Sequence, residues 1–246
     1  MAIDERLFAP DGGVATAPED RAEALVSAIE DPETGLILDV TGGDATSALL
    51  RELPGDIAVG GAATWYVGIS DNSTVHGWLE HAASGVTRVY WYPTNLVLDD
   101  AAIARRRFES LLDGADQHLD LRWIKGERLE GPVAGGNVRC LLKLAGTPFF
   151  PDLTSTTLML ECGSGGRSRF NAYFDQLADA GVLRSLRGLL LGDFGGLPPD
   201  DVDELAVYAG RLCSPDIAIA ATEFIGHGTD TMPVILGESL PLAKPG

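Results

Sequence analysis

The chain of 246 residues is 45% hydrophobic and carries a formal net charge of −18. This length allows one large domain or two small ones with a sizeable core. The negative charge argues against a nucleic-acid partner and against an anionic membrane surface, because both attract basic proteins.

The sequence also lacks features of export or membrane insertion. No stretch approaches 18 consecutive apolar residues, and the N-terminus has no apolar segment of a secretory signal. Cys140, Cys162 and Cys213 are an odd number at wide spacing, which matches neither a disulfide framework nor a zinc site. We therefore expect a cytoplasmic protein.

Strand-like and helix-like segments alternate through the first half of the chain. Helices are predicted at 18–33, 45–53, 72–83 and 100–113, and strands at 36–40 (buried), before Gly68 and at 86–98. This alternation is typical of an α/β layer with a parallel sheet.

From about residue 115 the pattern changes to shorter elements with more turns. We expect β structure at 121–137, a short helix at 138–146, strands at 157–161, 186–196 and 216–224, and helices at 170–183 and 200–212, followed by loops and short strands. We place the domain boundary here, which gives an N-terminal domain of residues 1–115 and a C-terminal domain of residues 116–246.

Ser70 lies where a predicted strand ends and a helix begins. Such a turn exposes a hydroxyl beside free backbone N–H groups, which is the setting of a serine nucleophile. The stretch Gly68-Ile69-Ser70-Asp71-Asn72 matches G-x-S-x-G only in part, and serine at a helix start is commonly a cap. The residues alone leave both interpretations open.

A serine nucleophile needs a base, and His227 has the most suitable surroundings. It lies between two glycines after an apolar strand, where active-site groups collect in α/β folds, although an ordinary turn residue is the alternative. His76 and His81 on the helix after Ser70, and His118 in a polar stretch, are expected at the surface.

The base needs an orienting carboxylate. Glu161 ends the apolar run 158–160, so it is either the partner of a buried base or a solvated strand end. Glu223 precedes His227 by four residues, but the glycines around His227 argue against a helical metal pair. The turn Thr41-Gly42-Gly43-Asp44 lacks the lysine of a phosphate-binding loop.

The order Ser, Glu, His and the surrounding sequence resemble the LD-carboxypeptidase family of serine peptidases, which includes muramoyl-tetrapeptide carboxypeptidases and microcin C immunity peptidases. The resemblance covers most of residues 18–237. The matching stretches are collinear: DRAEALVSAIEDPE, LDVTGGDATSALL, VGISDNST, EGPVAGGNVRCLLKLAGTPFFPDL, LMLECGSGGRSRFNAYFDQLADAGVL, LRGLLLGDF and FIGHGTDTMPVILG.

The resemblance implies Ser70 as nucleophile, Glu161 as triad acid and His227 as general base. It implies an oxyanion hole of backbone N–H groups, from Asp71 and from the turn containing Gly43. It further implies a parallel-sheet N-terminal domain carrying the nucleophile elbow, a β-rich α/β C-terminal domain supplying Glu and His, a homodimer, and no metal or organic cofactor.

The chain departs from the family pattern at several points. The usual Arg-Gly-Gly-Tyr-Gly turn reads Thr-Gly-Gly-Asp-Ala at 41–45, Cys162 and Asn171 stand where the family has acids, and a leading βαβ unit is expected to be missing. The substrate is therefore open among an L,D-peptide, an aminoacyl conjugate and a small natural product, cleaved by hydrolysis or acyl transfer. The alternative is a non-catalytic homologue that binds a peptide or protein partner in the former active-site cleft.

Overall fold

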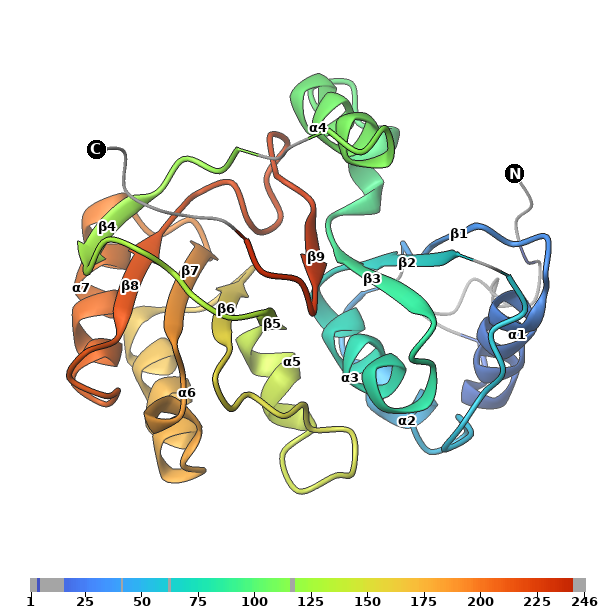
Figure 1. The fold of residues 1–246 in the computed structure, drawn as a ribbon, viewed down its shortest axis with the longest axis horizontal. Helices are drawn as coiled ribbons and strands as arrows, with labels where there is room; N and C mark the ends of the chain where they lie inside the picture. Colours follow the sequence, from blue (N-terminus) through green and yellow to red (C-terminus); the bar gives the residue numbers. More distant parts are fainter. Residues whose placement is uncertain (1–3, 5–15, 41, 62, 116–117, 241–246) are drawn as a thin grey trace.

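The computed structural model describes residue 4 and residues 16–40, 42–61, 63–115 and 118–240. Two β-sheets, each with its own helices, lie next to one another (Figure 1). Thr41, residues 5–15 and the first residues of the predicted second domain, 116–117, lie outside the described residues. None of the described helices combines the length and apolar character needed to cross a membrane.

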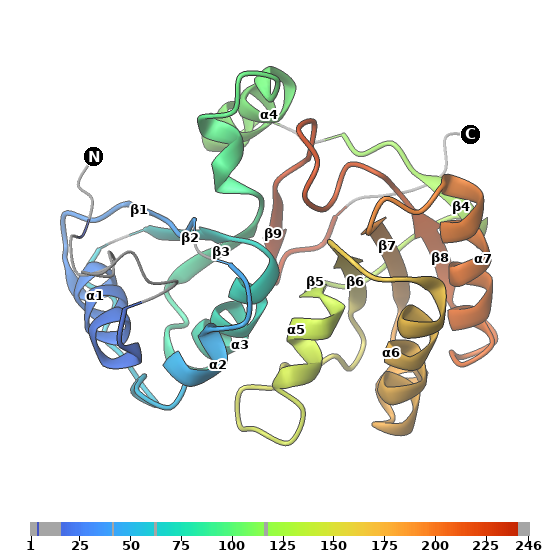
Figure 2. The ribbon, with the colours of Figure 1, turned by 180° about the vertical axis from the view of Figure 1, so that it is seen from behind.

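The first sheet has the strand order β1-β2-β3-β9, with β1 to β3 parallel and β9 antiparallel to β3. Its strands are β1 (Leu36–Leu38), β2 (Thr64–Gly68), β3 (Val86–Tyr90) and β9 (Val234–Leu236). Helices α1 (Pro18–Glu30), α2 (Thr46–Leu49) and α3 (Ser73–Ala82) cover one face, and α4 (Ala102–Leu112) packs on the other, as Figures 1 and 2 show. Consecutive residues of β2 contribute to the cores on the two faces: Tyr66 packs towards α3 and Val67 towards α4.

The second sheet has the order β4-β8-β7-β6-β5, parallel except for β4. Its strands are β4 (Arg122–Lys125), β5 (Val133–Asn137), β6 (Thr157–Cys162), β7 (Gly188–Phe194) and β8 (Ala218–Ala221). Helices α5 (Val138–Lys143), α6 (Arg167–Asp179) and α7 (Pro199–Gly210) pack on one face. Leu160 points to these helices and Met159 to the opposite face, so Glu161 shares the face of Met159.

The two sheets are joined through the end of the chain. After β9, the Gly237 N–H donates to Val133 O at 2.8 Å, and the Val133 N–H donates to Glu238 O at 2.8 Å. One apolar cluster also spans both sheets, with Ile69 and Tyr90 from the first and Met159 from the second. The carboxyl ends of β2 and β3 consequently meet those of β5 and β6.

The predicted fold class is confirmed, because both sheets are predominantly parallel and carry helices. Several local predictions were wrong. The strand predicted at 86–98 stops at Tyr90, because Pro93 opens a short 3₁₀ helix, η3 (Pro93–Leu96). The helix predicted at 45–53 has four residues, α2, and the chain turns before Pro54. The strand after residue 35, predicted as buried, is a partly exposed edge strand.

Candidate active site

Ser70 occupies a strained turn between β2 and α3. Its φ angle is +60°, a left-handed backbone conformation that residues other than glycine rarely adopt. A short 3₁₀ helix, η2 (Ser70–Asn72), leads from this turn into α3. The turn is tight, because a Cβ added at Gly68 would lie 2.9 Å from the Cβ of Asn72. This is the geometry of a nucleophile elbow, which presents one side chain at the end of a strand.

The next residue, Asp71, holds the elbow in place through several buried contacts. Its fully buried carboxylate accepts the Thr46 N–H at 2.9 Å and pairs with Lys143 Nζ at 2.7 Å. Its carbonyl oxygen accepts the hydroxyls of Thr46 and Thr74 at 2.9 and 2.8 Å. The Asp71 N–H, the predicted oxyanion donor, makes no hydrogen bond to any residue that the structure describes.

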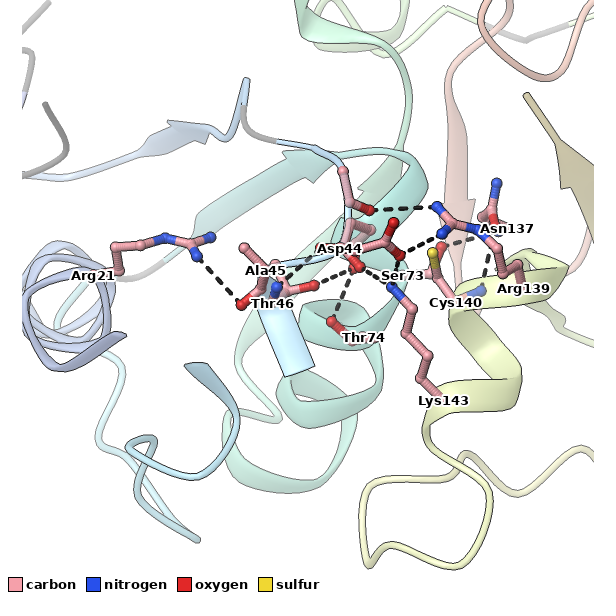
Figure 3. A network of polar contacts seen from close by, with 12 residues as sticks. Arg21, Asp44, Ala45, Thr46, Ser73, Thr74, Asn137, Arg139, Cys140 and Lys143 are labelled. Carbon is pink, nitrogen blue, oxygen red and sulfur yellow. Dashed lines mark hydrogen bonds and ion pairs between the residues drawn. The ribbon is translucent and has the colours of Figure 1, made fainter. Parts of the chain in front are cut away.

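Gly43, the second predicted oxyanion donor, lies in an exposed turn with φ +91°. The neighbouring Asp44 carboxylate pairs with Arg139 and, at 2.7 Å, with Lys143 (Figure 3). The hydrogen bond from Lys143 is the main reason that the pKa of Asp44 is lowered. Lys143 thus bridges Asp44 and Asp71, and holds the turn of Gly43 near the elbow.

Glu161 lies at the end of β6 and is completely buried. Its Oε1 accepts two hydrogen bonds, from the Tyr90 hydroxyl at 2.6 Å and from Asn137 Nδ2 at 2.9 Å. The same Tyr90 oxygen accepts the backbone N–H of Ser70 at 3.3 Å. Two residues from different sheets therefore hold one oxygen of this carboxylate.

The other oxygen of Glu161 faces His227, in the loop between β8 and β9. His227 Nδ1 lies 3.0 Å from Glu161 Oε2, an ion-pair distance. Burial lowers the pKa of His227, but the Glu161 contact and the Asp193 charge outweigh burial, so the pKa is raised. The side chain remains 29% exposed, so it is accessible from solvent.

Ser70 and His227 share no hydrogen bond among the described residues, and Ser70 Oγ has no partner within them. They are linked indirectly, through Tyr90 and Glu161. Catalytic hydrogen bonds are often long without substrate and tighten when it binds. The arrangement can support proton transfer from a serine hydroxyl to an imidazole that a buried carboxylate orients.

The histidine assignments need one correction. His76, expected at the surface, is 1% exposed, because α3 packs between the first sheet and α5 and has almost no solvent-facing side. Its Nε2 lies 3.1 Å from Gly68 O, and burial lowers its pKa to about 3. It is therefore neutral and donates from Nε2. His81 and His118 are exposed, as expected.

Sequence reasoning missed Tyr90 and Asn137, the two donors to Glu161. Tyr90 ends an aromatic strand and was interpreted only as part of that strand. Asn137 follows two glycines at the end of β5, directly across from Glu161 in the sheet register. A polar side chain at a strand end is the signal that could have identified Asn137. Among the described residues, no group of three or more His, Cys, Asp or Glu side chains is placed to hold a metal ion.

Comparison with known proteins gives a consistent family. The chain matches the LD-carboxypeptidase N-terminal domain over residues 3–90 and the LD-carboxypeptidase C-terminal domain over residues 130–242. A protein of Synechocystis sp. named as a carboxypeptidase, slr1534, is 25% identical over 225 residues, which are 88% of this chain and 72% of that protein.

Solved structures share the fold. An MccF-like protein from Streptococcus pneumoniae in complex with AMP superposes with a TM-score of 0.76 at 22% identity, covering 94% of this chain and 84% of that one. A muramoyltetrapeptide carboxypeptidase from Oxalobacter formigenes gives a TM-score of 0.74 at 22% identity, covering 91% and 80%. Family and fold together support a carboxypeptidase-like serine peptidase function. The chain belongs to the LD-carboxypeptidase family.

Proposed function

We propose that this protein is a serine peptidase that hydrolyses an amide bond, with Ser70 as nucleophile, His227 as general base and Glu161 as the carboxylate that orients the base. The observation that carries the proposal is the line of contacts from the strained Ser70 turn through Tyr90 and Glu161 to His227. Triad chemistry uses a buried carboxylate that orients a histidine and a serine presented on a sharp turn, and Glu161, His227 and Ser70 have these surroundings.

In the proposed reaction, Ser70 Oγ attacks the amide carbonyl carbon while His227 Nε2 takes the hydroxyl proton. Glu161 stabilises the resulting imidazolium through Nδ1, and His227 then gives the proton to the leaving amine. Water repeats the sequence on the acyl-serine and releases the acid. We assign the oxyanion hole to the Asp71 N–H, which has no partner among the described residues, and to the Gly43 N–H.

The proposed substrate is a small peptide with an L,D-linked carboxyl end or an aminoacyl conjugate. The name of the Oxalobacter formigenes relative supports the first class, and the AMP complex of the Streptococcus pneumoniae protein supports the second. Because Asp44, and not the tyrosine of the family pattern, stands on the turn near Lys143, we expect a substrate preference that differs from that of ordinary family members. We further propose a homodimer, which sedimentation of the purified protein tests.

The test is mass spectrometry of products and of the intact protein with a panel containing an L,D-tetrapeptide, aminoacyl-nucleotide conjugates and simple aminoacyl amides. Each compound is incubated with the native protein, with Ser70→Ala and with Ser155→Ala. Ser155 is a matched control, because it is the other described non-glycine residue with φ of +60° and lies before β6, at the end opposite Glu161. We expect turnover by the native protein and by Ser155→Ala, and none by Ser70→Ala.

Turnover that survives in Ser70→Ala would contradict the assigned nucleophile. Absence of both product and acyl-enzyme across the whole panel would favour the alternative, in which the cleft binds a peptide or protein partner without cleaving it. Binding of the same compounds to Ser70→Ala, measured by calorimetry, then separates a non-catalytic binding protein from one that ignores these compounds.

A further inference from the structure

Tyr90 is the point at which the two sheets meet inside the site. It ends β3 and is 1% exposed. Its hydroxyl accepts the Ser70 N–H at 3.3 Å and donates to Glu161 Oε1 at 2.6 Å. A single atom thus contacts the elbow that carries the proposed nucleophile and the proposed triad acid, which is 71 residues away from Tyr90 in the chain.

The surroundings are shaped to hold this ring. A Cβ added at Gly136 in β5 would lie 2.7 Å from Tyr90 Cε2 and 2.7 Å from Ser73 Oγ, so only glycine leaves room there. The ring of His76, buried and neutral, lies 6.0 Å from the ring of Tyr90. The tyrosine therefore has little freedom to turn its hydroxyl away from Glu161.

The hydroxyl remains a donor across the working pH range. Burial first, and then the adjacent Glu161 carboxylate, raise the pKa of Tyr90 well above its ordinary value. With Tyr90 and Asn137 both donating to Oε1, the acceptor left for His227 is Oε2. Glu161 on β6 and Asp193 on β7 raise the pKa of His227, and the ring of Tyr92, just after β3, lies 5.6 Å from the His227 ring. We expect Tyr90 to act on His227 through Glu161, which contacts both residues.

We propose that Tyr90 is a positioning residue, whose hydroxyl couples the Ser70 turn to Glu161 and holds that carboxylate with one oxygen facing His227. This inference rests on the proposed function, because Ser70, Glu161 and His227 are its triad. Tyr90 withdraws part of the negative charge of Glu161 through a short hydrogen bond. It thereby moderates how strongly Glu161 stabilises the imidazolium form of His227.

The test is the pKa of His227, measured by NMR titration of its ring without substrate, in the native protein and in Tyr90→Phe. Loss of the hydroxyl leaves more charge on Glu161, so we expect the pKa of His227 to rise by about one unit. The Ser70 amide, having lost its acceptor, should shift its NMR resonance and exchange with solvent faster. On an active substrate, kcat/KM should fall by about tenfold and its acid limb should move to higher pH.

Tyr66→Phe is the matched control. Tyr66 is equally buried, and its hydroxyl also donates to a carboxylate, that of Asp39 at 2.8 Å, on the strand that precedes the elbow. We expect this variant to leave the pKa of His227 unchanged. Replacement of Tyr90 by 3,5-difluorotyrosine keeps the hydroxyl and makes it a stronger donor, so it should lower the pKa of His227, opposite to Tyr90→Phe. It also serves if Tyr90→Phe fails to fold.

An unchanged or lowered pKa of His227 in folded Tyr90→Phe, or the same change in Tyr66→Phe, would overturn the inference. So would an unchanged or raised pKa with difluorotyrosine. The titration needs no turnover, so its result is separable from that of the proposed function. If no substrate is cleaved but the pKa moves as expected, the positioning role stands and the non-catalytic alternative is favoured.

Discussion

Gly163 offers a direct test of whether the position of the His227 ring controls activity. This exposed residue follows β6, and a Cβ added there would lie 2.9 Å from His227 Cε1 and Nδ1 and 3.3 Å from Nε2. Ordinary contacts begin at 3.4 Å, so in Gly163→Ala the ring must move by about half an ångström. Its φ is not in the left-handed region, so alanine imposes no backbone strain.

Because a displacement of about 1 Å in a catalytic group can cost about 100-fold, we expect kcat/KM to fall roughly tenfold, equivalent to about 1.4 kcal/mol. The free energy of unfolding should change by less than about 1 kcal/mol, since the site is exposed. The assay is steady-state kinetics on the best compound of the panel, with urea unfolding of the same preparations.

Gly166→Ala is the control for Gly163→Ala. It lies three residues further along the same loop, at the start of α6, and a Cβ there meets nothing within 4 Å. Full activity is expected for this variant. If Gly163→Ala and Gly166→Ala are equally active on a substrate that requires Ser70, the ring position described here does not govern catalysis and the role of His227 must be reassigned.

Further predictions concern pH and the anchors of the elbow. Because the pKa of His227 is raised above 6.5 in the folded protein, kcat/KM should decline as pH falls through that raised value. Glu161→Gln should move this acid limb of the pH profile to lower pH. An acid limb that does not move in Glu161→Gln would refute the pairing of His227 with Glu161. By linkage, the His227–Glu161 pair contributes its full stabilisation below about pH 6.5, and this contribution is lost as pH rises through the pKa of His227 in the folded protein. Urea unfolding of the native protein and of His227→Asn at a series of pH values measures this contribution. Asp71→Ala should lower the free energy of unfolding by about 3–5 kcal/mol, since it leaves Lys143 without its buried partner. Asp44→Ala, at a side chain 65% exposed, should lower it by less than about 1 kcal/mol. Similar losses for the two variants would contradict this reasoning.

Much of the fold follows from short-range patterns. The alternation of apolar strands and amphipathic helices predicted α1, α3, α4, β6, α7 and the parallel sheets within a few residues of their observed bounds. The errors occur where local signals compete. Pro93 ends β3 earlier than its aromatic run predicts, and the edge position of β1 leaves an apolar run partly exposed.

The candidate site also combines features that the sequence shows locally with features that depend on the whole fold. Ser70 at a strand end, Glu161 closing an apolar run and His227 between glycines are all visible as local features, because each depends on its own strand and turn. The burial of His76 is not visible locally. It depends on α5 of the second sheet covering the face of α3 that would otherwise meet solvent.

The sequence by itself thus determined the type and order of most elements, the α/β class and three residues with suitable chemistry, since hydrophobic periodicity and turn preferences are local properties of the chain. The tertiary structure alone decided that β9 returns to pair with β3, and that Tyr90 and Asn137 converge on Glu161. Hydrogen bonds between distant segments depend on how two sheets pack, and that packing is set by the whole apolar core and not by any one stretch of sequence.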